Sequence, residues 1–202
     1  MRWDTIQTSL RNAGHLVYAM DQAQTEVLTT PGPWGSASDG YCLGLAARWI
    51  QLRGWDSDFE YDAASRECEV LDWRATALQN FGADAPAATD QNKWIGAVAA
   101  HGMGVDPGLV QTVQQPPSGA ILTQLMTRAH GWYGITLVGQ TAAHAIAAEH
   151  AADGTFRMFD ANYGQTLSPD ARSFEGLMDW YFAFTGYDAQ FNRRTAMIGV
   201  DP

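Results

Sequence analysis

The chain has 202 residues, a length that suits a single domain. Its residues are 46% hydrophobic and 11% aromatic, which is enough to bury a core and excludes general disorder. There are 22 Asp and Glu against 12 Lys and Arg, and the resulting net charge of −10 argues against a nucleic-acid partner because it repels phosphate.

The first 130 residues carry mainly helical patterns. Apolar residues at three- and four-residue steps predict a long helix over 4–28, and segment 29–40, rich in Pro and Gly, predicts a loop. Further helices are predicted from about 40 to 53 and over 66–81, 90–101 and 120–128, with Asp90 and Ser118 as N-caps of the last two. Turns are predicted at 102–108 and 114–119.

After Gly131 the pattern changes to short runs that suit an antiparallel sheet. Strands are predicted over 133–138, 143–151, 155–160 and 195–200, with one helix over 172–184. Helices first and strands afterwards predict an α+β fold. We expect one domain over 1–202, with a mainly helical lobe at 1–130 and a sheet lobe at 131–202.

No pattern in the sequence indicates a membrane span, a disulfide framework or a cofactor. Its apolar runs are shorter than the roughly 18 residues of a span, and its start lacks the apolar core of a signal peptide. Two cysteines are too few for a disulfide framework or a cysteine-rich zinc site. His144 and His150 share a strand face, but about 20 Å separates them along a strand. We expect a soluble protein with no cofactor and no metal.

Cys42 is a candidate nucleophile. It opens a predicted helix directly after the Pro- and Gly-rich loop, where the positive end of the helix dipole lowers a thiol pKa and favours the nucleophilic thiolate. A cysteine by itself is also compatible with a small buried hydrophobic residue. Cys68 lies between two glutamates, which disfavour a thiolate, so we expect it to be inert.

His144 and Asp160 are candidate partners of the thiol. His144 stands among alanines on a predicted strand, where small neighbours leave room for a substrate-facing ring, although a hydrogen-bonded core histidine has the same pattern. Asp160 closes the next strand in a sequence that also suits a turn, Asp-Ala-Asn-Tyr-Gly. A carboxylate at a strand end can orient a histidine and fix its tautomer.

Three blocks in this order resemble the YopT/AvrPphB-type cysteine proteases, a papain-like group of bacterial effectors. The blocks are GYCLGLAARW at 40–49, HAIA at 144–147 and FDANYG at 159–164. The resemblance implies a papain-like fold in which Cys42 is the nucleophile, His144 the general base and acid, and Asp160 the orienting carboxylate. Ala161 stands where the family usually has Pro.

A second departure concerns the oxyanion donor. Papain-like enzymes often have Gln or Asn five or six residues before the cysteine, where this chain has Ser36 and Ala37. The backbone N–H of Cys42, with Ser36 or Ser38, are the candidate donors instead. Trp34 is a candidate cleft residue because it lies in the loop just before the nucleophile.

The proposed triad makes a geometric demand on the turn at Asp153-Gly154. A regular two-residue turn would send His144 and Asp160 to opposite faces of the sheet. A three-residue loop over 152–154, with Gly154 in the left-handed conformation, places Ile146 opposite Asp160 and makes His144 a diagonal neighbour of Asp160 on one face. We therefore predict an odd-numbered loop or a bulge, with Ile146, Ala148, Phe156 and Met158 forming the apolar surroundings.

The resemblance implies a protease that cleaves peptide bonds in a protein of a target cell. It also implies delivery by a specialised bacterial secretion system without a cleaved signal peptide, action in the target-cell cytoplasm, and a cognate chaperone or immunity protein as a further partner. A glutamine or asparagine deamidase and a peptidoglycan amidase toxin use the same triad and stay open. So does a non-catalytic binding module on a papain-like scaffold.

Overall fold

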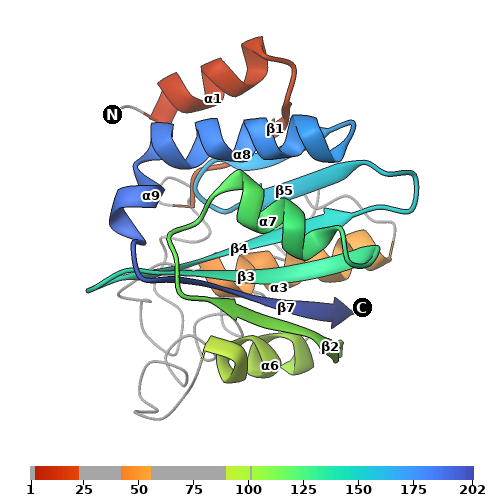
Figure 1. Cartoon of the computed structure of the whole chain (residues 1–202). Helices are drawn as coiled ribbons and strands as arrows, with labels where there is room; N and C mark the ends of the chain where they lie inside the picture. Colours follow the sequence, from red (N-terminus) through yellow and green to blue (C-terminus); the bar gives the residue numbers. More distant parts are fainter. Residues whose placement is uncertain (1–2, 23–41, 56–89, 101) are drawn as a thin grey trace, which may run out of the picture.

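The computed structural model describes residues 3–22, 42–55, 90–100 and 102–202, and its centre is one antiparallel sheet (Figure 1). The described strands lie in the order β1-β6-β5-β4-β3-β7-β2. They are β1 (Leu16–Ala19), β2 (Gly104–Val113), β3 (Gly131–Val138), β4 (Ala143–His150), β5 (Phe156–Asp160), β6 (Gly164–Ser168) and β7 (Arg194–Asp201). The described helices are α1 (Trp3–Asn12), α3 (Cys42–Gly54), α6 (Asp90–Ala100), α7 (Gly119–Met126), α8 (Ala171–Thr185) and α9 (Tyr187–Gln190).

The sheet separates two apolar cores, because helices cover both of its faces (Figure 1). On one face α3 and α6 pack through Trp49 and Trp94 against small residues of β4 and against Phe159. On the other face α1, α7 and α8 cover Tyr133 and Phe156. The mixture of helices with an antiparallel sheet is the predicted α+β fold.

Most elements predicted after residue 40 are confirmed within the described residues. Helices α3, α6, α7 and α8 and strands β3, β4, β5 and β7 lie where the patterns place them, with ends shifted by one or two residues. Ser118 caps α7 as predicted, since its hydroxyl accepts the N–H of Ile121 at 3.2 Å. The predicted helix at 66–81 and loop at 29–40 lie outside the described residues, as do Cys68 and the side chain of Asp90.

The prediction of a helix over 4–28 is wrong at 13–22, while 23–28 lie outside the described residues. Gly14 has a φ of 75°, a left-handed conformation that ends the helix and turns the chain into β1. Val17, whose position would suit the apolar face of such a helix, is 51% exposed, whereas Tyr18 beside it is buried. The local spacing suited a helix, but pairing with β6 gives this short segment its strand conformation.

The separation of helices from strands is also incomplete. Residues 104–113, expected to begin as a turn, form the edge strand β2, whose pairing with β7 is interrupted between Asp106 and Gln111 around Pro107. The sequence patterns also missed β6 and α9. The sheet therefore takes β1 and β2 from the part of the chain expected to be mainly helical.

None of the described helices is long and apolar enough to cross a bilayer.

Candidate active site

The hairpin of β4 and β5 has the predicted three-residue loop. The N–H of Ala151 bonds the carbonyl of Thr155, and the N–H of Gly154 bonds the carbonyl of Ala151, both at 2.9 Å. Gly154 has a φ of 84°, and Ala147 pairs with Phe159 in the predicted register. The register therefore brings two distant residues to the same end of the sheet.

His144 and Asp160 meet at this end of the sheet. The Nε2 of His144 lies 2.9 Å from Oδ1 of Asp160, and the two side chains are 7% and 0% exposed. Since Nε2 is engaged by the carboxylate, Nδ1 is the ring nitrogen left for another partner. A buried imidazole held in this way has a fixed tautomer and orientation.

The sulfur of Cys42 is the second partner of the His144 ring, and it comes from helix α3 on the opposite side of the sheet. Cys42 is the first residue of α3, and its sulfur is hydrogen-bonded to the His144 side chain and to the backbone N–H of Ala145. Helix α3 is firmly held beneath it: Trp49 donates to Gln165 at 2.6 Å and stacks on Phe159. The structure therefore brings Cys42, His144 and Asp160 into one cluster.

The cluster favours a thiolate and an imidazolium. Burial by itself would raise the pKa of Cys42, but the charge and hydrogen bond of His144 and the N–H of Ala145 lower it below its ordinary value. Burial would lower the pKa of His144, but the charges of Asp160 and Cys42 and their hydrogen bonds raise it to about 10. Between these two pKa values the proton resides on the imidazole.

Asp160 accepts several hydrogen bonds that hold its negative charge in the interior. Besides His144, the backbone N–H of Asn162 bonds Oδ1 at 2.8 Å and the hydroxyl of Tyr181 bonds Oδ2 at 2.7 Å. Burial raises the pKa of Asp160, but His144 and these donors together lower it below its ordinary value. Asp160 is therefore ionised at neutral pH.

The rings that shield the imidazole come from a part of the chain that the sequence patterns missed. Phe191 stacks on the His144 ring at 6.0 Å between centroids, and Tyr187 meets it edge-on at 5.3 Å. The expected companions, Ile146, Ala148, Phe156 and Met158, lie in the apolar core on this side of the sheet. The helix α9 and the residue after it thus provide the shielding rings at the imidazole itself.

The cluster opens into a cavity of about 490 Å³. Cys42 and His144 line it together with the β3–β4 loop, α9 and Phe191. Two further lining residues, Gln22 and Lys93, were not singled out from the sequence. Gln22 donates from its carboxamide to Asn162 Oδ1 and from its backbone N–H to the carbonyl of Ala161. No local motif marks either residue, because both reach the cavity only through the tertiary fold.

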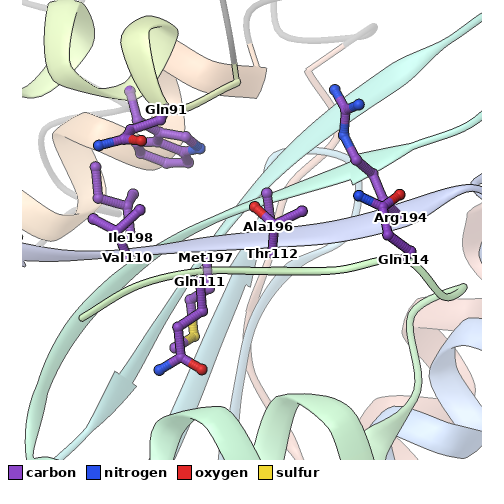
Figure 2. Close-up of a pocket in the computed structure, with 10 residues that line it drawn as sticks. Gln91, Val110, Gln111, Thr112, Gln114, Arg194, Ala196, Met197 and Ile198 are labelled. Atoms are coloured by element: carbon purple, nitrogen blue, oxygen red, sulfur yellow. The ribbon is translucent and has the colours of Figure 1, made fainter. Parts of the chain in front are cut away.

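A second cavity lies between α6 and the edge of the sheet formed by β2 and β7. Figure 2 shows Gln91 above Val110 and Ile198 at one end of this cavity and Arg194 at the other. The volume of the cavity is about 290 Å³. Its described lining residues include neither a cysteine nor a histidine. The candidate active site is therefore the cavity over Cys42.

No group of three potential metal ligands occurs among the residues that the structure describes. His150 stacks on Phe156, and its Nδ1 lies 3.1 Å from the carbonyls of Met126 and Ala129. Its role in the described fold is a packed core residue. The predicted cleft residues Trp34, Ser36 and Ser38 lie outside the described residues.

Two comparisons with known proteins found a match to this chain. The model of a C58 peptidase family, described as Yersinia/Haemophilus virulence surface antigen, matches residues 11–194. The crystal structure of the Pseudomonas avirulence protein AvrPphB is similar to the chain, with a TM-score of 0.60 and 16% sequence identity over 94% of this chain and 99% of that one. The likeness shows that the two share the papain-like fold. No curated protein sequence matches the chain.

Proposed function

The chain belongs to the C58 peptidases, the family of the Yersinia/Haemophilus virulence surface antigen, and is a cysteine protease; from this premise we propose that Cys42, His144 and Asp160 are its catalytic triad. The observation that carries the proposal is the buried hydrogen-bonded series from the Cys42 thiol through His144 to Asp160. The roles follow from the order of these contacts.

Cys42 is the nucleophile in this proposal. Its thiolate attacks the carbonyl carbon of the scissile bond and forms a tetrahedral oxyanion. As the C–N bond breaks, Nδ1 of His144 gives its proton to the leaving amine, and a thioester remains on Cys42. Water then attacks the thioester, His144 takes a proton from that water, and the carboxylic acid product leaves with regeneration of the thiolate.

Asp160 holds the imidazolium in place through these steps without leaving its carboxylate state. Its pKa lies below the ordinary value, whereas that of His144 is raised to about 10, so the proton stays on the imidazole. Both partners are buried, and the low dielectric of the interior strengthens their hydrogen bond.

We assign one oxyanion donor to the backbone N–H of Cys42, since the first N–H groups of a helix have no partner within it. Ser36 and Ser38 stay predicted second donors, and Trp34 a predicted cleft residue. The carboxamide of Gln22 lines the same cavity as the thiol. A carboxamide can supply an N–H to an oxyanion, so Gln22 joins these candidates.

The substrate in this proposal is a polypeptide of a target cell, cleaved in that cell's cytoplasm after delivery by a specialised secretion system. The family of virulence-associated peptidases supports this setting. A cognate chaperone or immunity protein belongs to the same proposal. Deamidation and amidase chemistry use the same atoms and differ only in the leaving amine.

The test combines intact-mass and N-terminal analysis of target-cell proteins incubated with the enzyme. The wild type should create new protein N-termini, and Cys42→Ala should create none, while Cys68→Ala should behave as wild type. His144→Asn should be inactive, whereas His130→Asn, at an exposed histidine, should retain activity. A mass increase of about one unit without fragments would replace proteolysis with deamidation. No Cys42-dependent change in any protein would contradict both.

A further inference from the structure

Lys93 lies in the lining of the active-site cavity, and it is the only lysine in the sequence. It belongs to the first turn of α6 and is partly exposed. The cavity wall that it forms faces a site in which Cys42 and His144 are the reactive groups. A substrate segment that occupies the cavity will therefore lie near the charge of this lysine.

The position of Lys93 is fixed relative to the thiol by buried contacts. The neighbouring residue Trp94 is 2% exposed and donates from Nε1 to the hydroxyl of Thr136 at 2.9 Å. Thr136 pairs across the sheet with Ala145, whose N–H bonds the sulfur of Cys42. The backbone of Lys93 is therefore tied to the catalytic cluster through rigid elements, while its own side chain keeps its freedom.

Among the described residues that line the cavity, no acidic group matches the charge of Lys93. Within the described part of the chain it forms no ion pair, and the cavity lining contains no Asp or Glu. Asp160 is fully buried behind His144 and bonded to it. Besides Cys42 and His144, the other polar residues in the described lining are neutral amides and hydroxyls, namely Gln22, Thr136, Thr141, Asn162, Tyr187 and Gln190.

The overall charge of the protein makes a local cation decisive for acidic substrates. A chain with a net charge of −10 repels an acidic segment at long range and attracts a basic one. A lysine in the wall of the cavity that Cys42 also lines reverses this preference locally, since its ammonium is a point charge on a flexible stem that can follow a carboxylate. A basic substrate segment would meet repulsion at this wall of the cavity.

We propose that Lys93 is a specificity-determining residue that binds an Asp or Glu side chain of the polypeptide substrate beside the scissile bond. This inference rests on the proposed protease function. It goes further because it names the chemistry of the segment that enters the cavity.

The first experiment measures the charge at the cavity without any knowledge of the natural target. Cys42 is alkylated with iodoacetate, an anion, and with iodoacetamide, its neutral analogue, and mass spectrometry follows modification at Cys42 alone. The ratio of the two rates cancels differences in thiol reactivity. Lys93→Gln should lower this ratio about threefold to fivefold and Lys93→Glu about tenfold, the size expected for one and two unit charges at a partly solvated site.

Matched variants separate a local from a global effect of charge. Lys93→Arg should keep the ratio, because it keeps the positive charge. Arg128→Gln removes one positive charge at an exposed residue after α7, on the other side of the sheet, and should leave the ratio unchanged. The difference between wild type and Lys93→Gln should shrink at about 1 M salt. Equal ratios in wild type, Lys93→Gln and Lys93→Glu would overturn the proposal.

The second experiment uses peptides and the inactive protein. Fluorescent peptide pools carrying a central Asp, Asn or Lys are titrated against Cys42→Ala, and the Asp pool should bind about threefold or more tightly than the Asn pool. Adding Lys93→Glu should reverse the order in favour of the Lys pool. Equal binding of the Asp and Asn pools would contradict Lys93 as the specificity residue. Alkylation of Cys42 at the slow rate of an unactivated thiol would instead contradict the proposed triad.

Discussion

The Nε2 of His144 donates to Oδ1 of Asp160 at 2.9 Å, and the two side chains are 7% and 0% exposed. A buried ion pair of this kind is costly unless its remaining hydrogen-bonding groups are satisfied. Here the carboxylate also receives the hydroxyl of Tyr181 and the N–H of Asn162, and the imidazole bonds the thiol of Cys42. The pair is therefore held by neighbours whose removal gives separable effects.

Asp160→Asn should lower the pKa of His144 by several units while preserving the shape of the site. The asparagine can still accept from Nε2, but it carries no charge, and burial then favours the neutral imidazole. In an NMR titration with labelled histidine, His144 should titrate at about pH 10 in wild type and at or below its ordinary value of 6.5 in the variant.

The same variant should slow the reaction of Cys42 with iodoacetamide at pH 7.5 by about tenfold or more, because the thiolate loses its positive partner. Circular dichroism serves as the control for folding. An unchanged titration of His144 in a folded Asp160→Asn protein would mean that the carboxylate does not hold the proton on the ring.

The free energy of unfolding should depend on pH in a direction that the His144–Asp160 pair determines. The variant Cys42→Ala removes the thiol and so isolates the contribution of this pair. The pKa of His144 is raised, so its contribution is fully present below 6.5 and is lost as pH rises through the folded value. The pKa of Asp160 is lowered from 3.8, so its contribution is present above 3.8 and is lost as pH falls. Urea unfolding of Cys42→Ala should therefore show greatest stability from this pair between about pH 4 and 6.5.

Asp160→Asn on the Cys42→Ala background provides the comparison. Above pH 6.5 the free energy of unfolding should fall more steeply with pH in Cys42→Ala than in the double variant, which lacks the charge that raises the His144 pKa. Parallel profiles for the two proteins would show that the pair is not coupled to folding.

Tyr181→Phe should destabilise the protein by about 1–3 kcal/mol, because it leaves Oδ2 of a buried carboxylate without its donor. The loss of this hydrogen bond should also raise the pKa of Asp160, so the fall of stability on the acid side should begin at a higher pH. Tyr133→Phe is the matched control: it removes another buried hydroxyl, whose bond goes to the Ala129 carbonyl at 2.6 Å. It should cost stability without altering Cys42 alkylation, and equal effects of both variants on alkylation would contradict a role of Tyr181 at the site.

The residues of the proposed triad could be predicted from the sequence because each belongs to a strong local pattern. Cys42 opens a helix after a glycine, and His144 and Asp160 lie at the ends of strands whose register follows from the loop at Gly154. The short distance between His144 and Asp160 is thus a consequence of periodicity and turn chemistry, which local sequence does encode, whereas Cys42 reaches His144 through the packing of α3 on the sheet.

The remaining parts of the site come from contacts that no local pattern encodes. The helix α9 has four residues, too few for a periodic signal, yet Tyr187 and the adjacent Phe191 shield the imidazole. Gln22 follows β1, for which the sequence pattern predicts a helix. This segment is a strand because it pairs with β6, which is far away in the sequence. Lys93 stands in a predicted helix, but which helical face borders the cavity depends on how Trp94 packs against β3.

Gly154 and Gly176 provide a final paired prediction about the register that the site requires. Gly154 has a φ of 84°, so Gly154→Ala should destabilise the hairpin by about 1–2 kcal/mol. Gly176 lies inside α8, exposed and with open space around the position of a Cβ, so Gly176→Ala should stabilise the protein by about 0.5–1 kcal/mol. Thermal or urea unfolding measures both changes. The strained loop should also move Asp160 relative to His144, so Gly154→Ala should slow the alkylation of Cys42 and Gly176→Ala should not. A similar slowing in both variants would mean that the reactivity of the thiol does not depend on the register of the hairpin.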